Sequence, residues 1–186
     1  MLQLAVPGFR DIFIFNPMAL APWMFITSIF LHGGITHLLF NSLALIMFAP
    51  YLERLIGSKH FVVLFLLAGL AGSVLFFLTI YFGIIDPVPA LGASGAIYGI
   101  LGALSILMPR LVVYIYFFPV PIRVATVFWF VIETAGSFNP NSRIASAAHL
   151  GGLLFGLLFG LYYQNKIRVE SAPAPASDKW YSAYLR

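Results

Sequence analysis

The sequence predicts an all-α fold, a bundle of helices that cross a lipid bilayer. Hydrophobic residues make up 61% of the 186 residues and charged residues only 9%, whereas a soluble domain carries roughly 25% charged residues. The apolar residues gather in runs close to the ~20 residues that a spanning helix needs. Because such a chain cannot cover its surface with polar groups in water, we expect a polytopic membrane protein built as one domain.

Five apolar segments, separated by charged or turn residues, are the predicted spans. They cover about residues 35–52, 61–85, 91–108, 124–136 and 144–163. Between the third and fourth segments lies an apolar stretch, residues 111–121, that holds Pro119 and Pro121. We expect this stretch to lie at the membrane interface, because proline breaks the hydrogen bonding of a spanning helix.

The N-terminal region is ambiguous by hydropathy alone. Residues 12–31 are apolar and uncharged, which would allow a sixth span, but Pro17 and Pro22 interrupt them. A break exposed to lipid leaves backbone groups unsatisfied, so we expect residues 1–31 to form a broken, partly embedded loop that packs on protein. Residues 32–166 would form the core. Residues 167–186, rich in alanine, proline and serine, would form a disordered tail.

Positive charges predict the orientation of the bundle, because Lys and Arg favour cytoplasmic loops. Lys and Arg residues follow the first, third and fifth segments, and fewer of them lie in the opposite loops. Those after the three segments are Arg54, Lys59, Arg110, Arg123, Lys166 and Arg168. The sequence therefore predicts a multi-pass protein of the cell membrane with a cytoplasmic C-terminus. The small net charge of +4 is explained by this orientation signal, so we expect no nucleic-acid partner.

Four polar side chains share one predicted depth in the membrane. His37, Ser94 and His149 precede a cytoplasmic boundary residue by 16 or 17 positions, and Asn41 is four residues after His37. At a rise of ~1.5 Å per residue, the three lie roughly 25 Å above the inner boundary. The sequence thus places a hydroxyl, two imidazoles and an amide near the outer face, where a cavity can admit water.

This group of side chains suits nucleophilic catalysis. A serine needs a neighbouring base to become a strong nucleophile, and histidine titrates near neutrality. Ser94 is the predicted nucleophile and His149 its base, while His37 and Asn41 would stabilise an oxyanion together with the backbone N–H of Ser94. Tyr98, one turn after Ser94, would stack on the imidazole and orient it.

No carboxylate is expected at this level on these three helices, since Asp86 and Glu133 lie in or beside other elements. A buried acid would also be costly inside a membrane. The sequence therefore predicts a Ser-His dyad. Glycines allow the two helices to approach, with Gly152, Gly156 and Gly160 on the same face as His149.

Three motifs together resemble the rhomboid family of intramembrane proteases. They are Trp23-x3-Thr27-x4-His32-x4-His37-x3-Asn41, Gly92-Ala93-Ser94-Gly95-Ala96-x-Tyr98, and Ala148-His149-x2-Gly152-x3-Gly156. The resemblance covers about residues 23–160. It implies a serine endopeptidase that cuts transmembrane or membrane-anchored proteins near the outer face, with Ser94 as nucleophile, His149 as base, His37 and Asn41 at the oxyanion, and Tyr98 beside His149.

The chain departs from the family pattern at two places. Met24 stands where the family often has arginine, which changes the contacts of that position. The family core has six helices, the first of which precedes the embedded loop. Residues 1–8 look like the end of that helix, so we expect the first family helix to be missing here.

Other functions remain open at this point. A transporter would need polar residues through the whole depth and an inverted repeat, and an inactive relative would bind membrane proteins without cutting them. A metal site is disfavoured, because His32 and His37 are five residues apart and no HExxH pattern is present. The absence of cysteine excludes disulfides, thiol catalysis and thiolate metal sites. We expect no cofactor and no metal.

Overall fold

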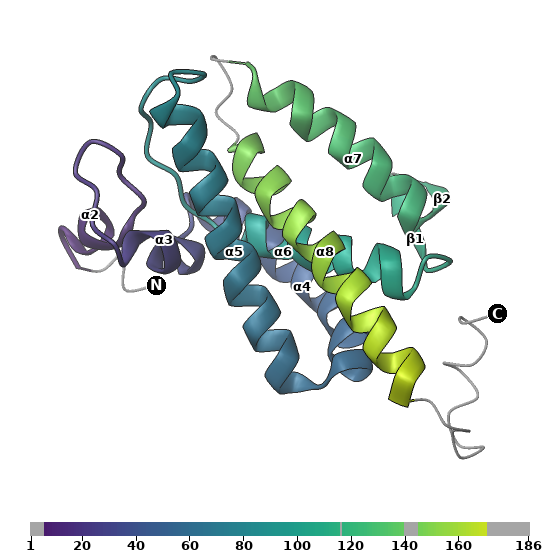
Figure 1. Cartoon of the computed structure of the whole chain (residues 1–186). Helices are drawn as coiled ribbons and strands as arrows, with labels where there is room; N and C mark the ends of the chain where they lie inside the picture. Colours follow the sequence, from purple (N-terminus) through teal and green to yellow (C-terminus); the bar gives the residue numbers. More distant parts are fainter. Residues whose placement is uncertain (1–5, 116, 140–144, 171–186) are drawn as a thin grey trace.

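A computed structural model (Figure 1) describes residues 6–115, 117–139 and 145–170, with side chains described as far as Lys166. In chain order the elements are α2 (Phe9–Phe13), α3 (Met24–Thr27), the 3-10 helix η1 (Ser28–Phe30), α4 (Ile35–Ile56), α5 (Ser58–Tyr81), α6 (Ser94–Leu107), β1 (Val112–Ile115), β2 (Phe118–Pro121), α7 (Ile122–Ser137) and α8 (Ser146–Glu170). The protein is mostly helical, as the composition predicts.

Three helices of the described chain are long and apolar enough to cross a membrane. They are α4, α5 and residues Ser146–Lys166 of α8. The helices α6 and α7 have 14 and 16 residues and fall short of the ~20 residues of a full span. All five predicted segments are thus helical, but the count of five complete spans is not confirmed. The predicted tail starts inside α8, and its residues 171–186 lie outside the described residues.

The N-terminal region forms short helices instead of one long one. Pro17 and Pro22 lie in the turns between α2 and α3. Phe15 is 1% exposed and packs its ring against Phe25 and against Phe76 of α5. Side-chain hydrogen bonds from Trp23 and Thr27 reach the backbone oxygens of residues 12 and 13. The segment is therefore a folded unit that packs beside α5, at the left of Figure 1.

The prediction of an all-α fold misses one element. Strands β1 and β2 form an antiparallel hairpin in the stretch that was expected only to lie at the interface. Pro119 pairs with Tyr114 and Pro121 with Val112. Proline donates no ladder hydrogen bond, and a two-stranded ribbon tolerates it because each strand has a free edge.

The centre of the molecule is α6, which α5 and α8 cover (Figure 1). The predicted glycine face of α8 is where these helices touch. A Cβ on Gly152 or Gly156 would overlap the backbone of Gly95 or Gly99 in α6. On the α5 side, a Cβ on Gly72 would meet the carbonyl oxygen of Ala148. Such backbone contact is typical of small-residue packing in membranes, and it fixes the height of α8 against α6.

Candidate active site

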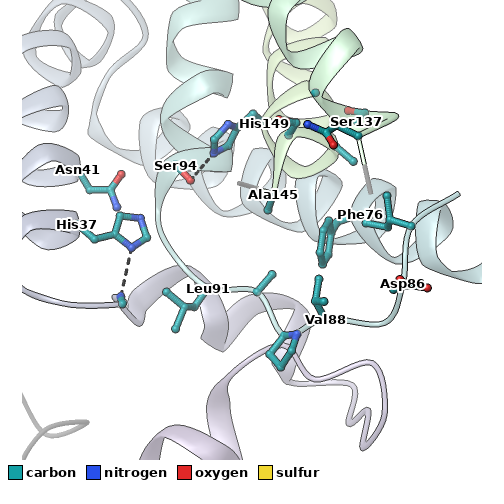
Figure 2. A pocket seen from close by; sticks show the side chains of 18 residues that line it. His37, Asn41, Phe76, Asp86, Val88, Leu91, Ser94, Ser137, Ala145 and His149 are labelled. Carbon is teal, nitrogen blue, oxygen red and sulfur yellow. Dashed lines mark hydrogen bonds between the residues drawn. The ribbon is translucent and has the colours of Figure 1, made fainter. Parts of the chain in front are cut away.

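Ser94 and His149 meet at the N-terminal ends of α6 and α8. Ser94 is the first residue of α6, and His149 lies in the first turn of α8. The Nε2 atom of His149 lies 2.8 Å from the Oγ atom of Ser94 (Figure 2). This distance is that of a strong hydrogen bond across 55 residues of sequence. The equal depth predicted for the two residues thus corresponds to direct contact.

Tyr98 stacks on the imidazole of His149. The two ring centroids are 4.5 Å apart and the ring planes differ by 8°. The phenol hydroxyl of Tyr98 donates a 2.6 Å hydrogen bond to Oε1 of Glu133 in α7. Tyr98 is therefore held at both its ring and its hydroxyl, which limits the motion of the histidine ring beside it.

The sequence predicted no carboxylate on the three helices that carry the site, and a fourth helix, α7, brings one to it. Oε1 of Glu133 lies 3.1 Å from Nδ1 of His149, on the side of the ring opposite Ser94. The N–H bond at Nδ1 does not point closely enough at Oε1 for a hydrogen bond. The two atoms are therefore within ion-pair distance, but Nδ1 has no hydrogen-bond partner among the described residues. Glu133 is 6% exposed. Its position inside an apolar segment was the available signal, because an ionisable residue in a membrane helix is by default a functional candidate.

His37 faces the site from α4, and its ring is oriented by the backbone. The N–H of Gly33 donates to its Nδ1 atom at 3.2 Å. A neutral imidazole that accepts at Nδ1 carries its proton on Nε2. Gly92 has a φ of +123° and no side chain, and a Cβ there would lie 2.9 Å from the His37 Nε2 atom. Because residue 92 is glycine, the Nε2–H donor of His37 can approach the loop that precedes Ser94.

Asn41 presents a second donor one turn further along α4. The residue is 7% exposed, and its Nδ2 atom is buried without a hydrogen-bond partner among the described residues. A buried amide that donates to no protein acceptor is costly unless something else accepts the hydrogen bond. Figure 2 shows His37 and Asn41 on the same side of the pocket, facing Ser94.

The predicted site residues line one cavity of about 640 Å³. His37 and Asn41 line it from α4, and Ser94 and His149 line it from α6 and α8. The loop between α5 and α6 closes another side with apolar residues and Asp86 (Figure 2). All four residues that the sequence assigned to catalysis and the oxyanion therefore face one space, which is large enough to hold an extended peptide segment and water.

His32 lies beside the site, although it does not line the cavity. Its ring centroid is 5.3 Å from that of His37. Burial, and then the neighbouring His37, lower the pKa of His32, so this imidazole is neutral at pH 7. Within the described part of the chain, no group of three His, Cys, Asp or Glu side chains has the geometry of a metal site.

Comparison with known proteins gives a consistent result. The Rhomboid domain family model matches residues 20–166. The chain is 33% identical to Rhomboid protein 1, mitochondrial, of Saccharomyces cerevisiae over 84% of its own length and 46% of that protein. It is 36% identical to Rhomboid protease GluP of Bacillus subtilis over 72% of its length and 24% of that protein. It is 35% identical to Putative rhomboid protease YdcA of the same bacterium, over 78% of its length and 70% of that protein. The chain thus spans from 24% to 70% of the length of these relatives.

Proposed function

The chain belongs to the rhomboid family, and from this premise we propose that it is an intramembrane serine endopeptidase that cuts transmembrane or membrane-anchored proteins. The 2.8 Å contact between the Ser94 hydroxyl and the His149 imidazole carries the proposal. Two relatives are named rhomboid proteases. The apolar helices mean that the reaction takes place in a membrane protein.

The first half of the reaction follows from the positions of the side chains. Oγ of Ser94 attacks the carbonyl carbon of the scissile peptide bond while its proton moves to Nε2 of His149. The carbonyl π electrons move to oxygen, which becomes an oxyanion. The unpartnered Nδ2 of Asn41 and the Nε2–H of His37 are the side-chain donors for that charge, and the backbone N–H of Ser94 is a third donor.

The second half returns the enzyme to its first state. The imidazolium gives its proton to the leaving nitrogen, the C–N bond breaks, and an ester to Ser94 remains. A water molecule then attacks the ester while His149 removes its proton, and the second collapse releases the acid and restores the serine hydroxyl. The net change is hydrolysis of one peptide bond, with no cofactor and no metal required.

We also propose the face of the membrane toward which the cavity opens. The distribution of Lys and Arg favours cytoplasmic loops after α4 and at the end of α8. The cavity would then open toward the extracytoplasmic face, five segments would cross the membrane, residues 1–31 would form an embedded loop, and the C-terminus would be cytoplasmic. We propose the cell membrane as the location. A substrate helix must unwind locally to expose its peptide bond, so helix-destabilising residues near the cut are expected.

Cleavage of a transmembrane substrate by the purified chain tests this function. We expect Ser94→Ala to lower turnover at least about 10³-fold, because the nucleophile is lost. Ser105→Ala is the matched control: it lies on the same helix, is buried, and donates only to the carbonyl of Gly102. This control should cleave within a few-fold of the wild type.

A fluorophosphonate probe gives a second measurement that does not depend on the choice of substrate. The wild-type chain should be labelled at Ser94, and Ser94→Ala should not be labelled. Equal cleavage by wild type and Ser94→Ala would remove Ser94 from the mechanism. A wild-type chain that neither cleaves nor reacts with the probe would be an inactive relative that binds its partners without cutting them.

A further inference from the structure

We infer that Glu133 is the third member of the site, a positioning residue that selects the tautomer of His149 and stabilises its imidazolium form. The inference rests on the proposed function, because it assigns a role within that same reaction. It extends the pair of Ser94 and His149 to a serine–histidine–glutamate arrangement, in which each residue comes from a different helix.

Glu133 is buried in the bundle. It is the only acidic residue among the buried side chains of the described chain. An ionised carboxylate in an apolar helix is stable only when hydrogen bonds or opposite charge compensate it. The Glu133 carboxylate accepts from the Tyr98 hydroxyl at 2.6 Å, lies 3.1 Å from the His149 Nδ1 and also interacts with the Ser146 side chain. Two of these three partners, Tyr98 and His149, belong to the site, so the carboxylate is stabilised in part by the groups of the proposed reaction.

The imidazole ring of His149 lies between the Glu133 carboxylate and the Ser94 hydroxyl. Oε1 of Glu133 faces Nδ1 of His149, while Nε2 of the same ring faces Oγ of Ser94. A carboxylate only accepts hydrogen bonds when it is ionised. It therefore favours the tautomer with the proton on Nδ1, which leaves the Nε2 lone pair free to accept the serine proton. The same charge stabilises the imidazolium that forms when this proton arrives, and Glu133 itself takes no proton.

Tyr98 contacts both His149 and Glu133. Its ring stacks on His149 while its hydroxyl binds the same Oε1 atom that faces Nδ1. The imidazole plane and the carboxylate are thus positioned by one side chain. The N–H direction at Nδ1 is not yet aligned with Oε1, and catalytic hydrogen bonds commonly align only when substrate is bound.

The other titratable groups around His149 have different positions. Tyr98 and Ser94 face it from α6, and His37 faces it from α4, where it acts as a second imidazole and not as a counter-charge. Asp86 lines the cavity from the loop after α5, but no ion pair joins it to His149 in the described structure. Glu133 is therefore the negative charge that contacts the ring.

The pH dependence of Glu133→Gln in the full chain tests the inference. We expect kcat to fall about 10²-fold with little change in KM. We also expect the acid limb of the kcat/KM profile to move to lower pH by about one unit, because the imidazolium loses its counter-charge. Glu133→Asp keeps the charge and should return the acid limb toward the wild-type position. Thr126→Val is the control, since it removes a buried hydroxyl two turns earlier on α7.

Several outcomes would overturn the inference. A Glu133→Gln enzyme with wild-type kcat and pH profile would do so. So would a slower enzyme whose acid limb stays in place, because that is the behaviour of a residue that only ties α7 to the bundle. In either case Ser94 would still react with the fluorophosphonate probe. Failure of the proposed function looks different, since wild type and Ser94→Ala would then behave alike.

A measurement on the wild-type chain keeps the test valid if the variants do not fold. In protein labelled with ¹⁵N-histidine, the resonances of His149 are identified by their absence in His149→Ala. The inference predicts that the neutral ring carries its proton on Nδ1. A neutral ring with its proton on Nε2 would overturn it.

Discussion

The two walls of the site cavity are built in different ways. On one wall, Ser94 and His149 are brought together by α6 and α8, whose backbones touch through glycines. On the other wall, His37 and Asn41 project from α4, a helix with few buried residues and a largely exposed apolar surface. The proposed nucleophile and base thus depend on helix packing, whereas the proposed oxyanion donor His37 depends on a local contact from Gly33. Substitutions in the two walls should therefore fail in different ways.

The largest effect is expected at the backbone contact between α6 and α8. In Gly156→Leu, the new side chain would overlap the backbone of Gly99 and force the helices apart. We expect the free energy of unfolding to fall by about 3 kcal/mol and turnover to fall below detection, because a shift of about 1 Å already costs roughly 10²-fold. Leu158→Ala, at a position of α8 that is 67% exposed, is the control for thermal unfolding and turnover. Wild-type activity in Gly156→Leu would contradict the role of this contact.

A smaller effect, confined to the reaction, is expected on the α4 wall. Asn41→Ala removes a donor that has no acceptor in the described protein. We expect kcat to fall about 10²-fold, as for the loss of one oxyanion donor, while KM and the melting temperature change little. Ser42→Ala, the next residue on the same helix and outside the cavity lining, is the matched control. A drop in stability without a drop in kcat would show that Asn41 only ties helices together.

The smallest effect is expected in the N-terminal segment. Thr27→Val removes the 2.8 Å hydrogen bond to the carbonyl of Phe13 and should lower the free energy of unfolding by about 1 kcal/mol. Because the adjacent Ser28 carbonyl accepts from the N–H of Gly92, a modest loss of activity would indicate that this segment supports the loop before Ser94. Thr134→Val is the control, since its hydroxyl is exposed and bonds only within α7. An unchanged melting temperature in Thr27→Val would show that the hydrogen bond contributes nothing.

The sequence predicted the meeting of Ser94 and His149 better than it predicted the elements around them. Ser94 and His149 could be placed at one depth because both precede a positively charged residue at the end of their apolar segment by almost the same number of residues. Glu133 was missed because it lies on α7, a helix that carries none of the other site residues, and because a buried acid is costly inside a membrane. Only the packing of α7 against the bundle shows that this carboxylate reaches His149.

The hairpin itself illustrates a different difficulty. Residues 111–121 are apolar and contain two prolines, which correctly argued against a helix. Nothing in the local pattern distinguishes an irregular interfacial stretch from a two-stranded ribbon, because both tolerate proline at these positions. The pairing of Tyr114 with Pro119 is a contact between two segments, and a single-segment pattern does not contain it.

The place of α8 in the bundle has a consequence for biosynthesis. Ser94 is made long before His149, and the proposed base reaches the serine only when α8 packs against α5 and α6. Because chains are synthesised from the N-terminus, a nascent chain has the Ser94 hydroxyl without its proposed proton acceptor until α8 has been inserted. The proposed enzyme would therefore be unable to cut neighbouring proteins while it is still being made.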